Sequence, residues 1–124
     1  MVYKLHTSKK TQEIFTTLGQ SIGLQPFILA KLAISLSINS GGISDDDFPT
    51  DNEGLELSRQ TIFGEHDLLF KCLIISHENR QIVESEFFPK LVKAHLDRGA
   101  ILLNNEKKYS RNFFAHLCNL DSTI

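Results

Sequence analysis

The chain opens on an alternating pattern that predicts a short strand. Within residues 2–7, apolar or hydroxyl side chains alternate with Lys4 and His6. A period of two over such a segment is typical of a strand with one buried and one exposed face. We therefore expect Leu5 to point into the protein and the two basic residues to point outward.

Two helical patterns follow the strand. Ser8 is suited to cap a helix over about residues 9–22, in which apolar residues recur at helical spacing up to Gly23. Pro26 is suited to the first turn of a second helix, because its missing N–H would be unpaired there in any case. This second helix is expected to end near residues 40–42.

The rest of the chain predicts a loop followed by further helices. Residues 41–58 are rich in Gly, Asp, Ser and Pro, which indicates a surface loop. Residues 64–77 predict a third helix that is apolar nearly all round, and we expect it to be the central buried helix. Residues 85–98 predict a fourth helix, which Gly99 ends or bends. Its inward-facing side chains are expected to be Phe87, Phe88, Leu91, Val92, His95 and Leu96.

The predicted fold class is mainly α, with a short N-terminal strand followed by four to five helices in a single domain. The strand, first helix and second helix occupy residues 1–40. The acidic loop occupies residues 41–58, and a helical core occupies residues 59–105. Residues 106–124 form a C-terminal extension with one more amphipathic stretch.

Charge is distributed unevenly along the chain. The net charge is −2, which argues against a protein that coats nucleic acid by bulk electrostatics alone. Residues 1–40 nevertheless carry four lysines against one glutamate, whereas residues 41–56 carry six carboxylates and no basic residue. This asymmetry suits a protein with one edge that faces an anion, and equally a solvated acidic loop beside an ordinary domain.

The opening strand raises the question of its pairing partner. One strand cannot form a two-stranded ribbon, so this start favours dimerisation through the same strand of a second copy, as in ribbon-helix-helix proteins. Such a ribbon would present Lys4 and His6 to the DNA major groove. The alternative is an edge strand that closes a helical domain, with its basic side chains merely solvated.

Further positions could contact phosphate if the ribbon forms. Lys9 and Lys10 begin the first helix, and the amino end of the second helix near Gln25 would offer free backbone N–H groups. Arg59, just after the acidic loop, is a candidate mobile phosphate contact. The candidate DNA-binding residues are Lys4, His6, Lys9, Lys10, Gln25, Lys31 and Arg59.

Neither a membrane span nor a signal peptide is predicted. The longest apolar runs lie within residues 68–75 and are interrupted by Lys71. The N-terminal residues are polar and basic where a signal peptide would be apolar. We therefore expect a cytoplasmic protein with reduced Cys72 and Cys118, and we expect Cys72 to behave as a small buried hydrophobic residue.

Signals for catalysis are weak. Asp45, Asp46 and Asp47 form a dense carboxylate cluster, but three consecutive side chains point in different directions and favour a solvated loop over a metal site. His66 and His95 are possible bases, although a histidine near a helix end is more typical of a surface or capping position. No catalytic residue, metal or cofactor is assigned, and the question of enzyme activity stays open.

The succession of segments resembles the DndE family of DNA sulfur modification (phosphorothioation) proteins. The similar segments run from about Leu5 to Asn105 and read LHTSKKT, IGLQPFILAKLAISLSI, TIFGEHDLL and KAHLDRG. The family pattern has an arginine in place of His6, a basic first helix where this chain has residues 19–21, and Thr-Pro in place of Gln25 and Pro26. These departures remove positive charge from the expected DNA side.

The resemblance implies a small, mainly helical accessory protein that forms a homo-oligomer, a dimer or a tetramer. It also implies binding to duplex DNA, including nicked duplex, beside larger modification subunits that carry out the sulfur chemistry. Two alternatives remain: a protein–protein adaptor of that complex that does not bind DNA, and a DNA nickase. Neither a membrane nor a cofactor is expected to be involved.

Overall fold

The computed structural model describes residues 4–43, 51–78 and 81–108. Its elements are β1 (Lys4–His6), α1 (Lys9–Ile22), α2 (Pro26–Asn39), β2 (Glu56–Ser58), α3 (Arg59–Phe63), the short helical turn η1 (Gly64–His66), α4 (Asp67–Ser76), the irregular helical segment η2 (Glu86–Leu91) and α5 (Val92–Lys108). The fold is mainly helical, as predicted. The predictions for Asp45, Asp46, Asp47, Cys118 and residues 109–124 lie outside the described residues.

The first two helices form where their patterns predicted them. The Ser8 side chain caps α1 by accepting a hydrogen bond from the amide of Thr11 at 3.1 Å. Gly23 follows the helix with φ of 73°, a left-handed conformation that glycine adopts without the cost of a Cβ. Pro26 is the first residue of α2. Local capping signals were therefore sufficient to predict both helices.

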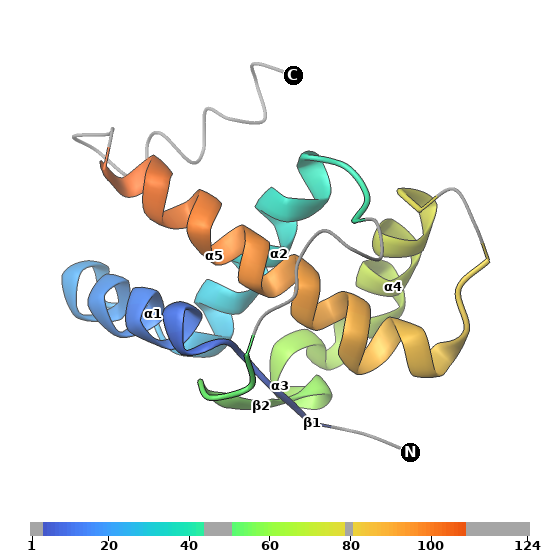
Figure 1. Ribbon diagram of the computed structural model, residues 1–124, viewed down its shortest axis with the longest axis horizontal. Helices are drawn as coiled ribbons and strands as arrows, with labels where there is room; N and C mark the ends of the chain where they lie inside the picture. The colour runs from blue at the N-terminus through green and yellow to red at the C-terminus, as the bar shows by residue number, and fades with distance from the viewer. Residues whose placement is uncertain (1–3, 44–50, 79–80, 109–124) are drawn as a thin grey trace.

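The core lies between α2 and α5. Helix α5 crosses the molecule, with α2 packed along it, α1 beside its C-terminal half and α4 at its other end (Figure 1). On α2, Leu29, Ala30, Ala33 and Ile34 are fully buried. The central buried helix is therefore α2, and not the helix over residues 64–77 that the apolar composition had suggested.

Gly99 continues helix α5 instead of ending or bending it. A Cβ on Gly99 would lie 1.7 Å from the carbonyl oxygen of Ala33, far inside van der Waals contact. The glycine therefore allows α2 and α5 to approach closely, and α5 runs on to Lys108. The predicted inward face is correct, because Phe87, Phe88, Leu91, Val92, His95 and Leu96 are all buried.

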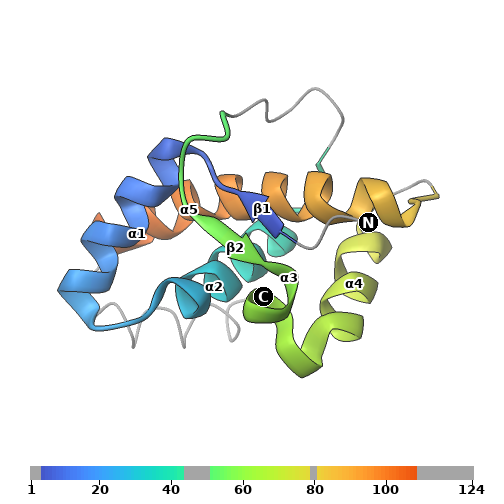
Figure 2. The same cartoon turned by 90° about the horizontal axis from the view of Figure 1, so that it is seen from below.

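The opening strand finds its partner within the same chain. Strands β1 and β2 pair antiparallel, with Lys4 opposite Ser58, Leu5 opposite Leu57 and His6 opposite Glu56. Figure 2 shows the two short strands side by side between α1 and α4. Part of the predicted loop over 41–58 is thus a strand. We had predicted that β1 pairs with the same strand of a second copy, because no second strand was recognised in the chain. Strand β2 shows that this prediction was wrong. The observed arrangement is the alternative, in which β1 closes a helical domain.

Helix α4 is short and lies at the surface. Of its residues only Ile74 is buried, whereas Leu68 is 72%, Leu69 56% and Leu73 38% exposed. Cys72 is also exposed, which corrects the expectation that it is buried. The preceding helix α3 was not predicted.

No single helix in the described ranges is long and apolar enough to span a membrane, although α1 and α2, bent by 112° relative to each other, pass that test as a pair by length and composition.

Candidate nucleic-acid interface

Four of the predicted DNA-binding residues come together where β1 leads into α1. We call Lys4, His6, Lys9 and Lys10 the basic edge; all four are exposed, while Leu5 between the first two is buried. Within the described part of the chain, Lys9 and Lys10 form no ion pair. Lys4 approaches Glu56, with its ammonium nitrogen 3.6 Å from the carboxylate. The edge therefore offers cationic side chains to solvent on one continuous segment.

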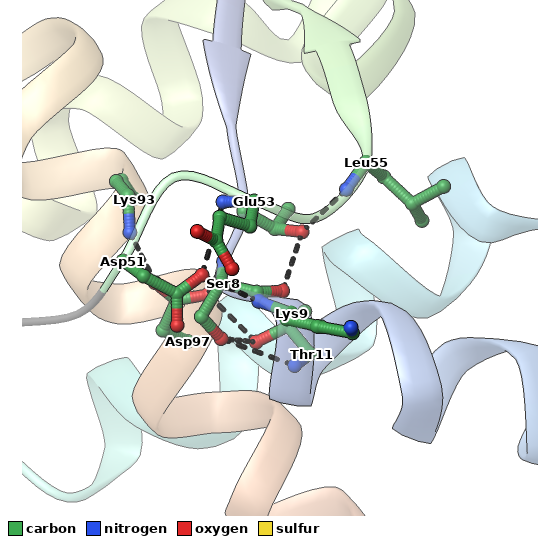
Figure 3. A network of polar contacts seen from close by, with 9 residues as sticks. Ser8, Lys9, Thr11, Asp51, Glu53, Leu55, Lys93 and Asp97 are labelled. Atoms are coloured by element: carbon green, nitrogen blue, oxygen red, sulfur yellow. Dashed lines mark hydrogen bonds and ion pairs between the residues drawn. The ribbon is translucent and has the colours of Figure 1, made fainter.

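The junction between β1 and α1 is held by a carboxylate from α5. The buried Asp97 side chain accepts hydrogen bonds from the Ser8 amide at 3.1 Å and from the Thr11 hydroxyl at 2.6 Å through the same oxygen. Its other oxygen accepts from the Lys93 ammonium at 2.7 Å (Figure 3). A negative charge at this position also suits the positive end of the α1 dipole. The start of α1, and with it Lys9 and Lys10, is thereby fixed to the core.

A second carboxylate covers the start of α1 from the solvent side. The exposed Asp51 side chain accepts from the amide of Glu53 at 3.0 Å and from the amide of Lys9 at 2.9 Å. These two hydrogen bonds, that from Glu53 first, lower the pKa of Asp51 below its usual value and keep it ionised. The Lys9 side chain extends away from Asp51 (Figure 3). One backbone donor of this helix terminus is therefore satisfied by the protein itself.

The segment that carries Asp51 is held against residue 7. The Thr7 amide donates to the Leu55 carbonyl at 2.9 Å, and the Gly54 amide donates to the Thr7 carbonyl at 2.8 Å. The Leu55 amide donates to the Thr7 hydroxyl at 2.9 Å. A Cβ on Gly54 would lie 2.2 Å from both the Ser8 carbonyl oxygen and the Thr7 hydroxyl oxygen. Glycine is thus required for this close backbone approach.

These supporting residues were not predicted from the sequence, for two reasons. Residues 55–58 alternate as Leu, Glu, Leu, Ser, a strand signal that was hidden within an acidic, glycine-containing segment. The local sequence around Asp97 indicates only the helical pair with Lys93, because the two residues that it holds at the start of α1 lie 86 and 89 residues away. The alternation around residue 56 could have revealed β2, whereas only the tertiary structure reveals the role of Asp97.

Gln25 and Lys31 lie apart from the basic edge. Gln25 precedes α2 at the far end of α1, and α1 has 14 residues, so the two ends of that helix are separated by about 20 Å. The Gln25 side chain makes no capping hydrogen bond to α2. Lys31 lies farther along α2 and is half-buried. The structure therefore divides the predicted residues between two regions.

Arg59 is engaged within the fold, unlike the mobile phosphate contact that was predicted. Its guanidinium donates to both carboxylate oxygens of Asp67, at 2.6 and 2.8 Å, and pairs with Glu84. It also lies over the rings of Phe87 and Phe88, with its central carbon 5.0 and 5.6 Å from the ring centroids. The hydrogen bonds with Asp67 are the main cause of a raised Arg59 pKa. This residue joins α3, α4 and η2.

His95 is a core residue and has no access to a substrate. Its Nδ1 lies 2.8 Å from the Ser37 hydroxyl, which in turn accepts from Nε of Arg98 at 2.8 Å. The hydroxyl proton therefore points to Nδ1 and the ring hydrogen resides on Nε2, which has no hydrogen-bond partner among the described residues and lies 3.9 Å from a Glu78 carboxylate oxygen. Burial, followed by the nearby charges of Arg98 and His77, lowers the His95 pKa to about 4.

The described residues hold no cluster that could bind a metal ion, since no group of three histidine, cysteine or acidic side chains comes together in those ranges. His66 is exposed and lies 3.8 Å from its neighbour Glu65. The predicted bases are thus a surface residue and a core residue. Among the predicted functional positions, the basic edge is the feature with accessible charge.

Comparison with known proteins agrees with the sequence resemblance. Residues 4–111 match the family described as DNA sulphur modification protein DndE. The fold is similar to the crystal structure of DndE from Escherichia coli B7A, described as involved in DNA phosphorothioation modification, with a TM-score of 0.69 and 22% identity over 83% of this chain and 97% of that chain. It is also similar to the crystal structure of a DndE mutant involved in DNA phosphorothioation, with a TM-score of 0.60 and 23% identity over 85% of this chain and 99% of that chain.

No curated protein matches the chain. At these identities the two crystal structures support the fold, whereas the family match covers most of the sequence. The chain belongs to the DndE family of DNA sulphur modification proteins.

Proposed function

We propose that this protein is a DNA-binding accessory subunit of the DNA phosphorothioation machinery and that the basic edge contacts the phosphate backbone. The observation that carries the proposal is the placement of Lys4, His6, Lys9 and Lys10 as exposed side chains on one strand and the first turn of the next helix. Membership of a DNA sulphur modification family supports DNA as the anion. In this role the sulfur chemistry belongs to the larger subunits of the machinery.

The physical basis of binding is the release of counterions. Each lysine that neutralises a phosphate releases condensed cations, and the logarithm of the binding constant then falls with the logarithm of salt concentration by about 0.9 per contact on duplex DNA. With a net charge of −2, affinity must come from local charge on the edge instead of from the overall charge.

The test compares charge changes at the edge with the same change elsewhere. Lys10→Gln and Gln81→Glu each lower the net charge by one; Gln81 is exposed and lies in the segment between α4 and η2. Helix α4 lies at the other end of the molecule from α1 (Figure 1). Binding to intact and to nicked duplex is measured by fluorescence anisotropy over a salt series. We expect Lys10→Gln to lower both the affinity and the salt slope, and the triple variant Lys4→Glu, Lys9→Glu, Lys10→Glu to remove binding.

Two outcomes would exclude this assignment. Equal effects of Lys10→Gln and Gln81→Glu would show that only the net charge matters, and unaltered binding by the triple variant would place the contact elsewhere. The region of Gln25 and Lys31 is then the second candidate for the DNA contact, and Lys31→Gln tests it in the same assay.

A second candidate function, a protein–protein adaptor of the same machinery, is favoured by the surface of α4. We call Leu68, Leu69 and Leu73 the apolar α4 face; all three are exposed large hydrophobic side chains. Apolar patches of this kind commonly mark contact surfaces between proteins. The same face suits contact with a second copy, so that the protein would act as a homo-oligomer.

Charge at the apolar α4 face tests the adaptor role. Leu69→Lys is expected to leave the fold intact, because the side chain is 56% exposed, and to reduce co-purification with the larger subunits or the size measured by light scattering. An adaptor without DNA binding requires the wild-type protein to show no retention of duplex at low salt. Unchanged co-purification and size would instead remove the apolar α4 face as a contact surface.

A further inference from the structure

The basic edge is accompanied along its length by carboxylates from a distant part of the chain. We call residues 51–58 the acidic strap; it contains Asp51, Glu53 and Glu56, and it includes β2. The strap runs antiparallel to β1 and then along the start of α1 (Figures 2 and 3). Negative charge is therefore placed beside the segment that the proposed function uses for binding phosphate.

Backbone contacts hold the acidic strap in this position. Three hydrogen bonds join Thr7 to residues 54 and 55, with donor–acceptor distances of 2.8 to 2.9 Å. The buried side chain of Leu57 stands opposite Leu5 in the strand pair. Gly54 allows the strap to approach the chain at residues 7 and 8 more closely than any side chain would permit. The strap is thus a built part of the fold and not an adjacent loop.

The carboxylates of the acidic strap lie close to the basic edge, Glu56 beside the Lys4 side chain and Asp51 beside the Lys9 backbone. Glu56 lies 3.6 Å from the Lys4 ammonium and stands directly opposite His6 in the strand pair. Asp51 accepts from the amide of Lys9 at 2.9 Å. Exposed charges interact within a screening length of about 10 Å at moderate salt, so these carboxylates lower the positive potential that an approaching phosphate would meet.

We propose that the acidic strap is an autoinhibitory element that competes with DNA phosphates for the basic edge. The inference rests on the proposed DNA-binding function and adds its regulation. Phosphates of duplex DNA compete with the strap carboxylates for the cationic side chains of the basic edge. The wild-type protein therefore binds DNA more weakly than a protein with the same basic edge and no strap carboxylates would. A tight complex then requires a partner, or a change in the strap, that neutralises or moves these carboxylates.

Replacing a strap carboxylate by the amide of the same shape distinguishes a local effect on the basic edge from an effect of net charge. Glu56→Gln and Asp51→Asn keep the shape of each side chain, and the amide oxygen that Asp51→Asn introduces can still accept from the backbone amide of Lys9. The matched control is Glu65→Gln on η1, where the carboxylate is 89% exposed and the net charge changes by the same amount. We expect the two strap variants to tighten duplex binding at low salt by about two- to fivefold, the range for exposed charge pairs, and the control to change it less.

A variant without charge change gives an independent arm. Gly54→Ala pushes the strap away from residues 7 and 8, and we expect it to tighten duplex binding in the same direction, with circular dichroism confirming the fold. If Gly54→Ala does not fold, the isosteric variants decide alone. Equal shifts for Glu56→Gln, Asp51→Asn and Glu65→Gln would overturn the autoinhibitory role while leaving DNA binding in place.

Failure of the proposed function has a different signature. In that case neither the wild-type protein nor any strap variant binds intact or nicked duplex at low salt. If the wild-type protein does not bind but Glu56→Gln or Asp51→Asn does, both the DNA-binding function and the role of the strap are supported.

Discussion

The carboxylate of Asp97 in α5 lies 2.6 Å from the hydroxyl of Thr11 in α1, a contact between residues 86 positions apart. The same oxygen accepts from the Ser8 amide, and the other accepts from the ammonium of Lys93. Because Asp97 is 1% exposed, its charge is tolerated only with these partners in place. The contact therefore fixes the α1 start to the core.

Replacing Asp97 by Ala is expected to lower the free energy of unfolding by about 3 kcal/mol, since it removes the acceptor of the buried Ser8 amide and Thr11 hydroxyl and one hydrogen bond of Lys93. Urea denaturation followed by circular dichroism measures this loss. Glu65→Gln, at an exposed carboxylate, is the control and is expected to change stability by less than about 0.5 kcal/mol. A loss no larger than that of the control would contradict the assigned role of Asp97.

Gly99→Ala tests the close approach of α2 and α5. In an exposed helix this substitution would stabilise the protein by up to about 1 kcal/mol through helix propensity. Here the added Cβ would lie 1.7 Å from the Ala33 carbonyl oxygen, so the helices must separate. We expect a net loss of about 2 kcal/mol or more, measured by the midpoint of urea unfolding. A gain in stability would show that the two helices are not in close contact at this position.

His95 makes stability depend on pH in a defined window. Its pKa falls from 6.5 to about 4 on folding, because burial and the charges of Arg98 and His77 disfavour the imidazolium. The unfolded chain therefore binds a proton that the folded protein does not, and stability is lost as pH falls from about 6.5 toward 4. The total effect is on the order of 3 kcal/mol.

Substitution of His95 by Gln isolates this contribution. The variant is expected to lose less stability than the wild type between about pH 6.5 and pH 4.5 in urea titrations. Glu84 and Asp51, whose pKa values are lowered on folding, add their own loss of stability toward the acid end of this range, but they do so in both proteins, so the difference between the two slopes reports His95. His66→Gln is the control at an exposed histidine. Identical pH slopes for the wild type and His95→Gln would exclude the buried imidazole as the cause.

Arg59 is predicted to contribute to stability and not to DNA binding. Arg59→Lys keeps the positive charge but loses the paired hydrogen bonds to Asp67 and the stacking over Phe87. Because the group is partly exposed, we expect a loss of about 1 kcal/mol in urea unfolding. The salt slope of duplex binding should stay the same in Arg59→Gln. A slope smaller by about 0.9 would make Arg59 a phosphate contact after all.

Local signals predicted the elements whose boundaries are set by neighbouring residues. Ser8, Gly23 and Pro26 determine the ends of α1 and α2 through backbone hydrogen bonds and φ preferences, and these were readable from the sequence. The identity of the central helix was not readable, because it depends on small residues that allow a close approach. Ala33 against Gly99 makes α2 central, whereas the richer hydrophobicity of α4 leaves much of its surface exposed.

The candidate site was predictable in one part only. The exposure of Lys4 and His6 follows from the alternation around Leu5, and the structure confirms it. The carboxylate beside Lys4 comes from residue 56, and the carboxylates that hold the start of α1 come from residue 51 and from α5; such pairings over large sequence separations leave no periodic signal. Arg59 shows the same limit, because the partners that immobilise it lie 8 and 25 residues away.

The pairing of β1 with β2 imposes an order on events during synthesis. Strand β1 leaves the ribosome before residues 56–58, its partners, because Glu56 follows His6 by 50 positions in the chain. Asp97, which holds the start of α1, emerges later still. Leu5 therefore cannot reach its native contacts in the nascent chain until these later residues have been made, so β1 becomes part of the core well after its own synthesis.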